Sequence, residues 1–251
     1  MYRMLSHISL FILFVVVLTG CAGSQEATNK KTEALQRLGT SLVQQGNLRA
    51  GLEKLLEAAE LDPTNSDIHH ELALVYRDLG EFQLSLAHFK KALALRPEFP
   101  QAWNNMGTVY LLLRQWDQAI NCFQMAVGDI LYRTPHYAYN NLGFAYLKKD
   151  QYQKAIANFQ KALKFAPLFT PAQTNLGLAL ERMNRWEEAV DTYKKAISMD
   201  PEYPAAHFHL GRLYMKFNRN AQAAEELHQV IKLDPRGRLA QEARKLLDSM
   251  R

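Results

Sequence analysis

Small residues and prolines return at a fixed interval along most of this chain. The small residues are Gly39, Ala73, Gly107, Gly143, Gly177 and Gly211, and the prolines are Pro63, Pro97, Pro167, Pro201 and Pro235, with Leu131 in the one missing place. The steps between successive small residues are 34, 34, 36, 34 and 34 positions. A period of this length predicts an array of repeats, in which each unit buries its apolar face only against its neighbours.

Each unit is expected to form a hairpin of two helices. With the small residue at position 8, large apolar side chains recur at positions 4, 7, 11 and 24, and a second small residue at position 20. Positions 8 and 20 are where the two helices cross closely, so only small side chains fit. Proline ends the second helix because it lacks an amide donor and clashes with the preceding turn. The predicted units are 32–65, 66–99, 100–133, 136–169, 170–203 and 204–237.

Unit three shows the pattern most fully. Trp103, Met106, Gly107, Tyr110, Ala119, Phe123 and Ala126 occupy its positions 4, 7, 8, 11, 20, 24 and 27. In this register the chain resembles the tetratricopeptide repeat. The resemblance implies an all-α fold: a right-handed superhelical solenoid of six helix hairpins plus a C-terminal capping helix over 238–251. The end units depart from the pattern, with Gly51 and Leu55 in the first and Asn220 and Val230 in the sixth, as expected for repeats that face solvent.

The first residues are not expected to belong to the array. Arg3 gives a positive start, and residues 8–18 are apolar, which is shorter than the roughly 20 residues of a membrane span but suits a signal peptide. The stretch ends in Leu18-Thr19-Gly20-Cys21, which resembles the bacterial lipobox. We therefore predict a lipoprotein signal peptide over 1–20, an acylated Cys21 and a flexible tether over 21–31. The alternatives are an uncleaved anchor, or an ordinary signal peptide with an incidental cysteine.

The residue after the predicted lipid attachment site bears on location. Ala22, not Asp, follows Cys21, and under the sorting rule of enteric bacteria this implies release to the outer membrane. The expected location is the outer membrane, lipid-anchored and facing the periplasm. Cys122 is the only other cysteine, so no intrachain disulfide is expected after acylation, and Cys122 is expected to lie buried in its repeat.

Composition and motifs argue against several classes of function. The chain is 48% hydrophobic and 22% charged with a formal charge of +5, and no basic run with interleaved aromatics would track nucleic acid. It has no glycine-rich phosphate loop, serine elbow or zinc-type spacing. No catalytic residue, cofactor, metal or small-molecule substrate is therefore expected, and an enzyme is the disfavoured alternative. His69 and His207 fall at position 4 and are expected in the core.

A protein partner is the favoured ligand. In a tetratricopeptide array, positions 2, 5, 9, 12 and 13 of each first helix line the concave face, and here they form a partly apolar floor with a polar rim. Such a stripe predicts groove binding of an amphipathic segment. The expected groove residues are Leu74, Arg77, Asn104, Leu111, Leu112, Tyr137, Asn140, Phe144, Leu147, Leu178 and Arg182, with Lys148 and Arg212 also on the rim. The alternative is that the leucines pack between units and that Asn105, Asn141 and Asn175 only hydrogen-bond neighbouring helices.

The interval between units three and four lacks the proline and is two residues longer. Its Leu131-Tyr132-x-x-Pro135 and following Ala138-x-x-Asn141-Leu142-Gly143 resemble the same interval of the type IV pilus biogenesis and stability lipoproteins, the PilF/PilW-type pilotins. The resemblance implies a non-catalytic outer-membrane lipoprotein that binds secretin subunits and promotes their localisation and multimerisation. The alternatives are a scaffold for outer-membrane barrel assembly or for a peptidoglycan enzyme complex. Structurally, the interval could also be no more than a longer turn.

Overall fold

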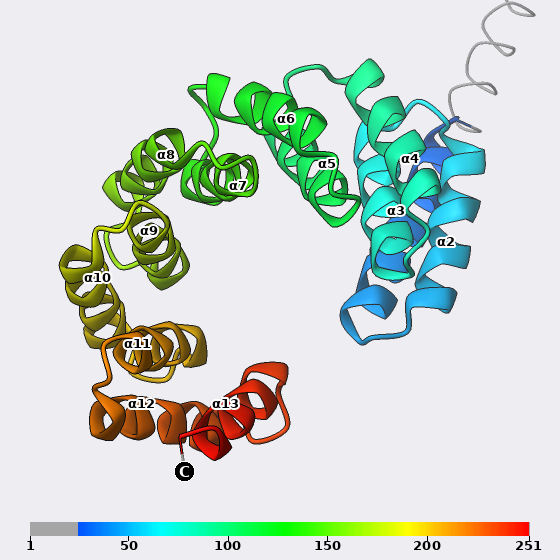
Figure 1. The fold of residues 1–251 in the computed structure, drawn as a ribbon. Helices are drawn as coiled ribbons and strands as arrows, with labels where there is room; N and C mark the ends of the chain where they lie inside the picture. Colours follow the sequence, from blue (N-terminus) through cyan, green and yellow to red (C-terminus); the bar gives the residue numbers. More distant parts are fainter. Residues whose placement is uncertain (1–24, 251) are drawn as a thin grey trace, which may run out of the picture. The chain divides into compact units, whose positions relative to one another are not determined.

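The computed structural model describes residues 25–250, and these form helices joined by short turns, with no β-strand among them (Figure 1). They divide into two compact units, one ending at Val109 and the other beginning at Tyr110. The predicted all-α array of helix hairpins is confirmed for this part of the chain. The signal peptide, Cys21 and the start of the tether lie outside the described residues. No described helix is both long and apolar enough to cross a bilayer.

The first unit begins with a helix over residues 25–44. It continues with α2 (Leu48–Leu61), α3 (Ser66–Asp78), α4 (Phe82–Leu95) and the start of α5 (Pro100–Leu112). Helix α3 packs on both α2 and α4. The side chain of Asn65 caps α3 by accepting hydrogen bonds from the amides of Asp67 and Ile68, which satisfies donors that the first turn of a helix leaves free. The core of this unit contains Leu55, Ala58, Ile68, Leu72 and Val75.

The second unit contains the end of α5 and eight further helices. These are α6 (Trp116–Gly128), α7 (Pro135–Lys148), α8 (Tyr152–Phe165), α9 (Thr170–Arg182), α10 (Trp186–Met199), α11 (Pro204–Lys216), α12 (Asn220–Leu233) and α13 (Arg238–Asp248). From α6 onward each helix packs on the next, and the first helices α7, α9 and α11 also contact one another in turn. Helix α13 packs on α11 and α12, so the predicted capping helix is present.

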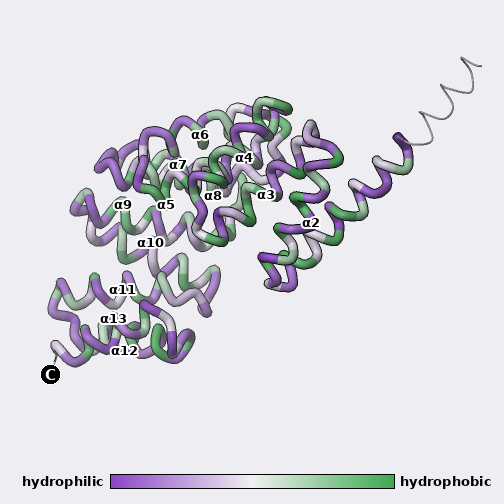
Figure 2. The backbone as a smooth tube through the Cα atoms, turned by 90° about the vertical axis from the view of Figure 1, so that its right-hand side faces the viewer, coloured by the Kyte–Doolittle hydropathy of each residue, from purple (hydrophilic) through white to green (hydrophobic). Residues whose placement is uncertain are grey.

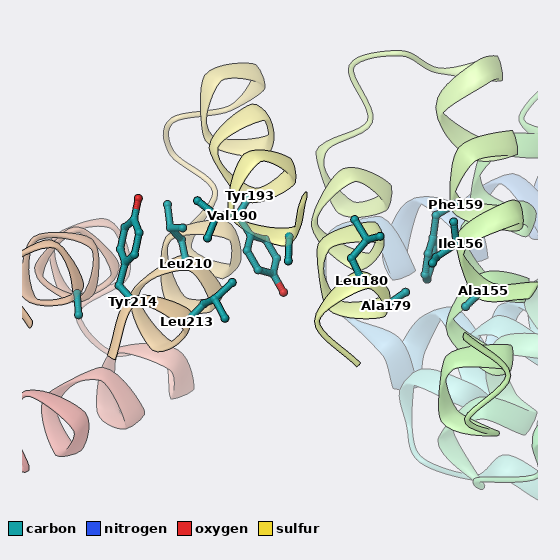
Figure 3. Close-up of a cluster of buried hydrophobic side chains, with 12 residues drawn as sticks. Ala155, Ile156, Phe159, Ala179, Leu180, Val190, Tyr193, Leu210, Leu213 and Tyr214 are labelled. Atoms are coloured by element: carbon teal, nitrogen blue, oxygen red, sulfur yellow. The ribbon is translucent and has the colours of Figure 1, made fainter. Parts of the chain in front are cut away.

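Apolar residues alternate with polar ones along each helix (Figure 2), and the apolar sides meet in the core. In the second unit the largest cluster of buried side chains extends from α8 to α12 (Figure 3). Phe159, Tyr193 and Leu213 are among its members. Cys122 is buried in α6, as the sequence predicts. The stability of this unit therefore rests on packing between neighbouring repeats.

The periodic small residues lie where the helices of a hairpin approach most closely. A Cβ atom added to Gly177 would lie 2.5 Å from Cε1 of Tyr193. In the first hairpin both helices need glycine: a Cβ on Gly51 would lie 2.8 Å from the carbonyl oxygen of Gly39. Gly51, a departure from the alanine usual at position 20, thus reflects a closer backbone contact in this hairpin.

The periodic prolines mark the ends of the second helices. Helices α2, α4, α8, α10 and α12 each end two residues before their proline.

A second regularity lies in the turn inside each hairpin, where position 15 has a left-handed backbone. Glycine occupies it at Gly46 and Gly80, whereas Arg114, Asp150, Asn184 and Asn218 adopt φ values of 57–59°. A left-handed conformation strains a side chain such as that of Arg114.

The predicted flexible tether is wrong for residues 25–31, which are helical and continue into the first repeat. Side chains four residues apart support this extension. Gln25 Nε2 donates to Asn29 Oδ1 at 3.0 Å, and Lys30 Nζ lies 2.6 Å from Glu26 Oε1. Such pairs stabilise a helix by a few tenths of a kcal/mol each. The polar composition indicated a tether, but the same residues at this spacing also suit an exposed helix.

Candidate protein-binding groove

A hollow of about 350 Å³ lies on the first helices of the last three repeats. Its lining comes from α7, α9 and α11 and the turn after α7: Phe144, Leu147, Lys148, Asp150, Leu178, Arg182, His209 and Arg212. All belong to the second unit. Six of them were predicted for the groove or its rim, namely Phe144, Leu147, Lys148, Leu178, Arg182 and Arg212. Part of the predicted groove therefore lies in one hollow of this unit.

The floor of the hollow is apolar, and its rim carries three cations, Lys148, Arg182 and Arg212, beside one carboxylate, that of Asp150. Phe144, Leu147 and Leu178 are half-buried and pack against the core. Lys148 Nζ lies 4.9 Å from the centre of the Phe144 ring, and Arg182 is exposed one repeat further along. Because α7 and α9 place the same repeat positions side by side, the cations form a row beside the apolar floor. This arrangement suits a segment that carries both apolar and acidic side chains.

The guanidinium of Arg212 is held in place by hydrogen bonds that run through the half-buried Glu181 to the buried Tyr193. Arg212 Nη2 donates to Glu181 Oε1 at 2.9 Å, and the hydroxyl of Tyr193 donates to Glu181 Oε2 at 3.1 Å. Burial and the neighbouring Glu181 carboxylate raise the pKa of Tyr193 above its usual range, so the hydroxyl stays protonated as a donor. The network ties the rim of the hollow to the core between α9 and α11.

His209 adds a polar ring to the wall of the hollow. It stacks on Tyr193 with a centroid distance of 5.8 Å, and burial lowers its pKa to about 4. The ring is therefore neutral near pH 7. Its Nδ1 atom is buried and has no hydrogen-bond partner within the described part of the chain.

Several predicted groove residues of the second unit lie outside the hollow. Leu111 packs against the core cluster around Phe123. Leu112 is 58% exposed, and Tyr137 is 48% exposed with its ring 5.3 Å from that of Phe169. For Leu111, the alternative of packing between helices holds. Leu112 and Tyr137 are exposed, but not at this hollow.

The asparagines bond to one another or to neighbouring side chains. Asn175 Nδ2 donates to Asn140 Oδ1 at 3.0 Å, joining α9 to α7. In the first unit, Asn105 Nδ2 lies 3.1 Å from Nε2 of His70, joining α5 to α3. At these sites the bonds link first helices of successive repeats, as expected if these asparagines hydrogen-bond neighbouring helices.

The first unit has a different surface. Leu74 is half-buried, and Arg77 donates to its neighbour Asp78 at 2.8 Å. Asn104 is only 8% exposed, so its prediction as a residue facing a partner is wrong. The side chain points into the packing, which position 5 alone did not reveal.

A polar hollow lies elsewhere in the first unit, between the helix over 25–44 and α3. Its lining is Glu33, Gln36, Arg37, Thr40, Ser41, Gln44 and Glu71. Glu71 accepts hydrogen bonds from Thr40 Oγ1 at 2.9 Å and Gln36 Nε2 at 3.2 Å, and burial raises its pKa. Most of these residues occupy positions 2, 5, 9 and 13 of the first repeat, residues 32–65, and these are positions that were expected to line the groove. The same groove positions, applied to this first repeat, identify most of the lining residues. They also predict that this hollow is mostly polar.

The histidines at position 4 are core residues, as expected. His69 Nε2 donates to the carbonyl of Pro63 at 3.0 Å, and His207 Nε2 donates to that of Pro201 at 2.9 Å. The Trp103 indole makes the same bond to Pro97 at 3.0 Å. In these three repeats, position 4 thus fastens the first helix to the proline turn before it. No cluster of three or more metal-ligating side chains occurs in residues 25–250.

Comparisons with protein families match most of the chain to models of one repeat family. Models described as tetratricopeptide repeat match residues 54–87, 98–167, 134–202 and 183–247, and a TPR repeat model matches residues 73–114. Together these matches span residues 54–247. They cover all of the predicted repeats except residues 32–53 of the first.

Two curated relatives match part of the chain. The type IV pilus assembly protein PilF of Pseudomonas aeruginosa is 30% identical over 132 residues, which cover 49% of this chain and 52% of PilF. The photosystem I assembly protein Ycf3 of Synechococcus elongatus is 38% identical over 94 residues, covering 35% of this chain and 54% of Ycf3. The chain spans about half the length of these relatives.

Two solved structures resemble the fold over most of their length. The structure of Pseudomonas aeruginosa PilF gives a TM-score of 0.74 at 23% identity and covers 87% of this chain and 99% of PilF. The crystal structure of PilW, a widely conserved type IV pilus biogenesis factor, gives 0.76 at 21% identity, covering 84% and 97%. At these identities the likeness concerns the fold. The chain therefore belongs to the tetratricopeptide repeat family and is similar to PilF and PilW.

Proposed function

We propose that this chain is a non-catalytic outer-membrane lipoprotein of type IV pilus biogenesis. It binds secretin subunits in the periplasm and promotes their localisation and multimerisation at the outer membrane. Two observations support the pilus assignment: the similarity to PilF and PilW, and the lipobox-like Leu18-Thr19-Gly20-Cys21. An acylated Cys21 would hold the array on the membrane and raise the local concentration of the captured subunit.

The hollow on α7, α9 and α11 is the observation that carries partner binding. It joins an apolar floor to a rim in which the cations of Lys148, Arg182 and Arg212 outnumber the one carboxylate, that of Asp150. A segment with an apolar side chain would cover Phe144 and Leu178, while a carboxylate would meet Arg182. A charge-assisted hydrogen bond of this kind contributes about 1.5–3 kcal/mol.

Complementation of a deletion strain tests the proposal. The parent chain should restore heat-resistant secretin multimers and pili, and Phe144→Glu should not, because a carboxylate on the floor would oppose an apolar, acidic segment. Met125→Glu is the matched control, since Met125 is an exposed apolar side chain on α6 of the same unit and lies outside the hollow. Circular dichroism of both variants establishes that helical content is retained.

Arg182→Glu offers a second variant that spares the floor. Arg182 is exposed at the end of α9, so the change is not expected to disturb packing. It should weaken capture by roughly 10- to 100-fold, whereas Lys195→Glu on the exposed face of α10 should not. Normal secretin multimers in the deletion strain, together with general envelope defects, would contradict the proposal and favour a scaffold for barrel assembly or for a peptidoglycan enzyme complex.

A further inference from the structure

Two turns of the second unit project aliphatic side chains into solvent. Ile130 and Leu131, on the α6–α7 turn, are 96% and 81% exposed, and Leu168, on the α8–α9 turn, is 77% exposed. Single exposed apolar residues are ordinary on protein surfaces. Here three of them, almost free of protein contacts, occur on consecutive inter-repeat turns. None of them lines the hollow described above.

Ring contacts hold the two turns side by side. The ring of Phe169, next to Leu168, lies 5.0 Å from that of His136 and 5.3 Å from that of Tyr137, at the start of α7. Phe165 is exposed and stacks on Tyr139 at 5.6 Å. These contacts bring the start of α7 against the end of α8 and the turn after it, so the exposed side chains of the two turns lie at the same end of these helices. We call Ile130, Leu131, Phe165 and Leu168 the turn patch.

The α6–α7 turn has a defined conformation that directs these side chains outward. The amide of Leu131 donates to Asp129 Oδ1 at 2.8 Å, and the amide of Tyr132 donates to the Asp129 carbonyl at 3.2 Å. Tyr132 itself is buried. Since Tyr132 anchors the end of the turn, the two residues before it stand away from the core.

The other inter-repeat turns are polar at the corresponding place. Leu168 follows its proline directly, and the residues that follow the other periodic prolines are Thr64, Glu98, Glu202 and Arg236. Among the turns that contain a periodic proline, only the α8–α9 turn therefore has an apolar residue directly after it. Phe165, by contrast, lies at a position that is apolar in other repeats too, as at Leu95, which is 40% exposed.

The charges around the turn patch are almost all positive. Arg133, Lys161 and Lys164 are exposed in the two segments that carry it, residues 129–139 and 161–169. The only carboxylate in these segments is that of Asp129, which already accepts a hydrogen bond from the turn. An anionic surface complements this arrangement.

We propose that the turn patch contacts the surface of a bilayer that contains anionic phospholipid. The side chains of Ile130, Leu131 and Leu168 enter the boundary between headgroups and acyl chains, and the cations meet lipid phosphates. Projecting side chains favour lipid over protein, because a bilayer accepts them without a matching pocket. Aromatic rings such as that of Phe165 suit the same depth. This contact is separate from partner capture in the hollow and does not require acylation of Cys21.

Fluorescent labelling of the full chain in vesicles tests the contact. In a Cys21→Ser background, cysteines are introduced by Leu131→Cys or Leu168→Cys and labelled with an environment-sensitive fluorophore, with Glu202→Cys as the matched control. Glu202 occupies the same repeat position as Leu168, one repeat later. Cys122 is buried, and the Cys21→Ser chain, labelled in parallel, gives the background. The vesicles contain phosphatidylethanolamine and phosphatidylglycerol, with spin-labelled lipid as quencher.

Labels at 131 and 168 should shift to shorter wavelength and be quenched by the lipid, while the label at 202 should not. Quenching should fall in phosphatidylcholine vesicles, because these vesicles carry no net charge. The bound fraction of the chain should drop roughly fivefold for each of the three cations that no longer meets anionic lipid. Lys161→Gln with Lys164→Gln should reproduce part of that fall in anionic vesicles, and Lys194→Gln with Lys195→Gln should not.

Two results would overturn the proposal. One is that the labels at 131 and 168 stay as exposed to water as the label at 202 while the chain is attached to anionic vesicles. The other is shielding without vesicles, whether it grows with the concentration of the chain or needs an added protein. Such shielding would assign the turn patch to a second copy of the chain or to a protein partner. Neither result would bear on capture in the hollow.

Discussion

Replacing Gly177 with alanine tests the role of the periodic small residues most sharply. The new Cβ would lie 2.5 Å from Cε1, 2.8 Å from Cδ1 and 2.9 Å from Cζ of Tyr193. That ring is fully buried, its hydroxyl is bonded to Glu181, and its face stacks on His209. Because the ring is held at both its face and its hydroxyl, relief requires α9 and α10 to move apart. Overpacking of this kind costs about 1–3 kcal/mol, against a gain of about 0.5–1 kcal/mol from replacing a helical glycine.

The net expectation for Gly177→Ala is a loss of about 1–2 kcal/mol in the free energy of unfolding, or roughly 2–8 °C in Tm for a chain of this size. Thermal unfolding followed by circular dichroism measures it, and hydrogen exchange should place the loosening in α9 to α11. Gly128→Ala is the control, since no atom lies within 4 Å of its added Cβ, and its stability should be unchanged or slightly higher. A Gly177→Ala variant as stable as the parent would refute the close-crossing account of position 8.

Three further predictions concern stability. Burial lowers the pKa of His70 and His88 to about 4. Their neutral rings therefore contribute fully to the free energy of unfolding above about pH 6.5, the pKa of a histidine in the unfolded chain, and this contribution is lost as the pH falls from there toward 4. The urea midpoint should therefore fall between pH 7 and pH 5, and less so in His88→Gln. A hydrogen bond to Glu226 raises the pKa of His207, so this contribution is complete below about pH 6.5 and is lost as the pH rises through the folded pKa. In urea titrations Glu226→Gln should cost about 1.5–3 kcal/mol in mild acid and less at high pH; an equal loss at both would contradict it. Arg114→Gly should raise the free energy of unfolding by up to about 1 kcal/mol by relieving a left-handed φ of 57°; a loss measured by urea unfolding would contradict it.

The helices were predictable from sequence because their determinants are local. A proline after each second helix and a small residue at each crossing act within one hairpin, so the spacing alone placed the hairpins. Gly51 shows the limit of the pattern, since its meaning depends on the backbone of Gly39 across the hairpin. The helical residues 25–31 were missed because short polar side chains suit both a tether and an exposed helix.

The candidate groove was predictable only in part, because its residues depend on the neighbouring repeat. Phe144 and Leu178 lie at position 9 of consecutive units and meet in one hollow. Asn140 has an equally favourable position, but the amide of Asn175 from the next repeat occupies its oxygen. His209 was missed because it lies at position 6, which is not among positions 2, 5, 9, 12 and 13 that were expected to line the concave face. A side chain's burial and partners depend on the residue one repeat away, which a reading of single positions does not include.

Photo-crosslinking in cells tests partner capture by the hollow most directly. A photoreactive phenylalanine analogue is placed at Leu178, on the floor of the hollow, and at Met125, on an exposed face of the same unit. On illumination, the chain substituted at Leu178 should crosslink to a secretin subunit, and the chain substituted at Met125 should not. Crosslinks to secretin from Met125 alone, or crosslinks from Leu178 only to other envelope proteins, would contradict the account.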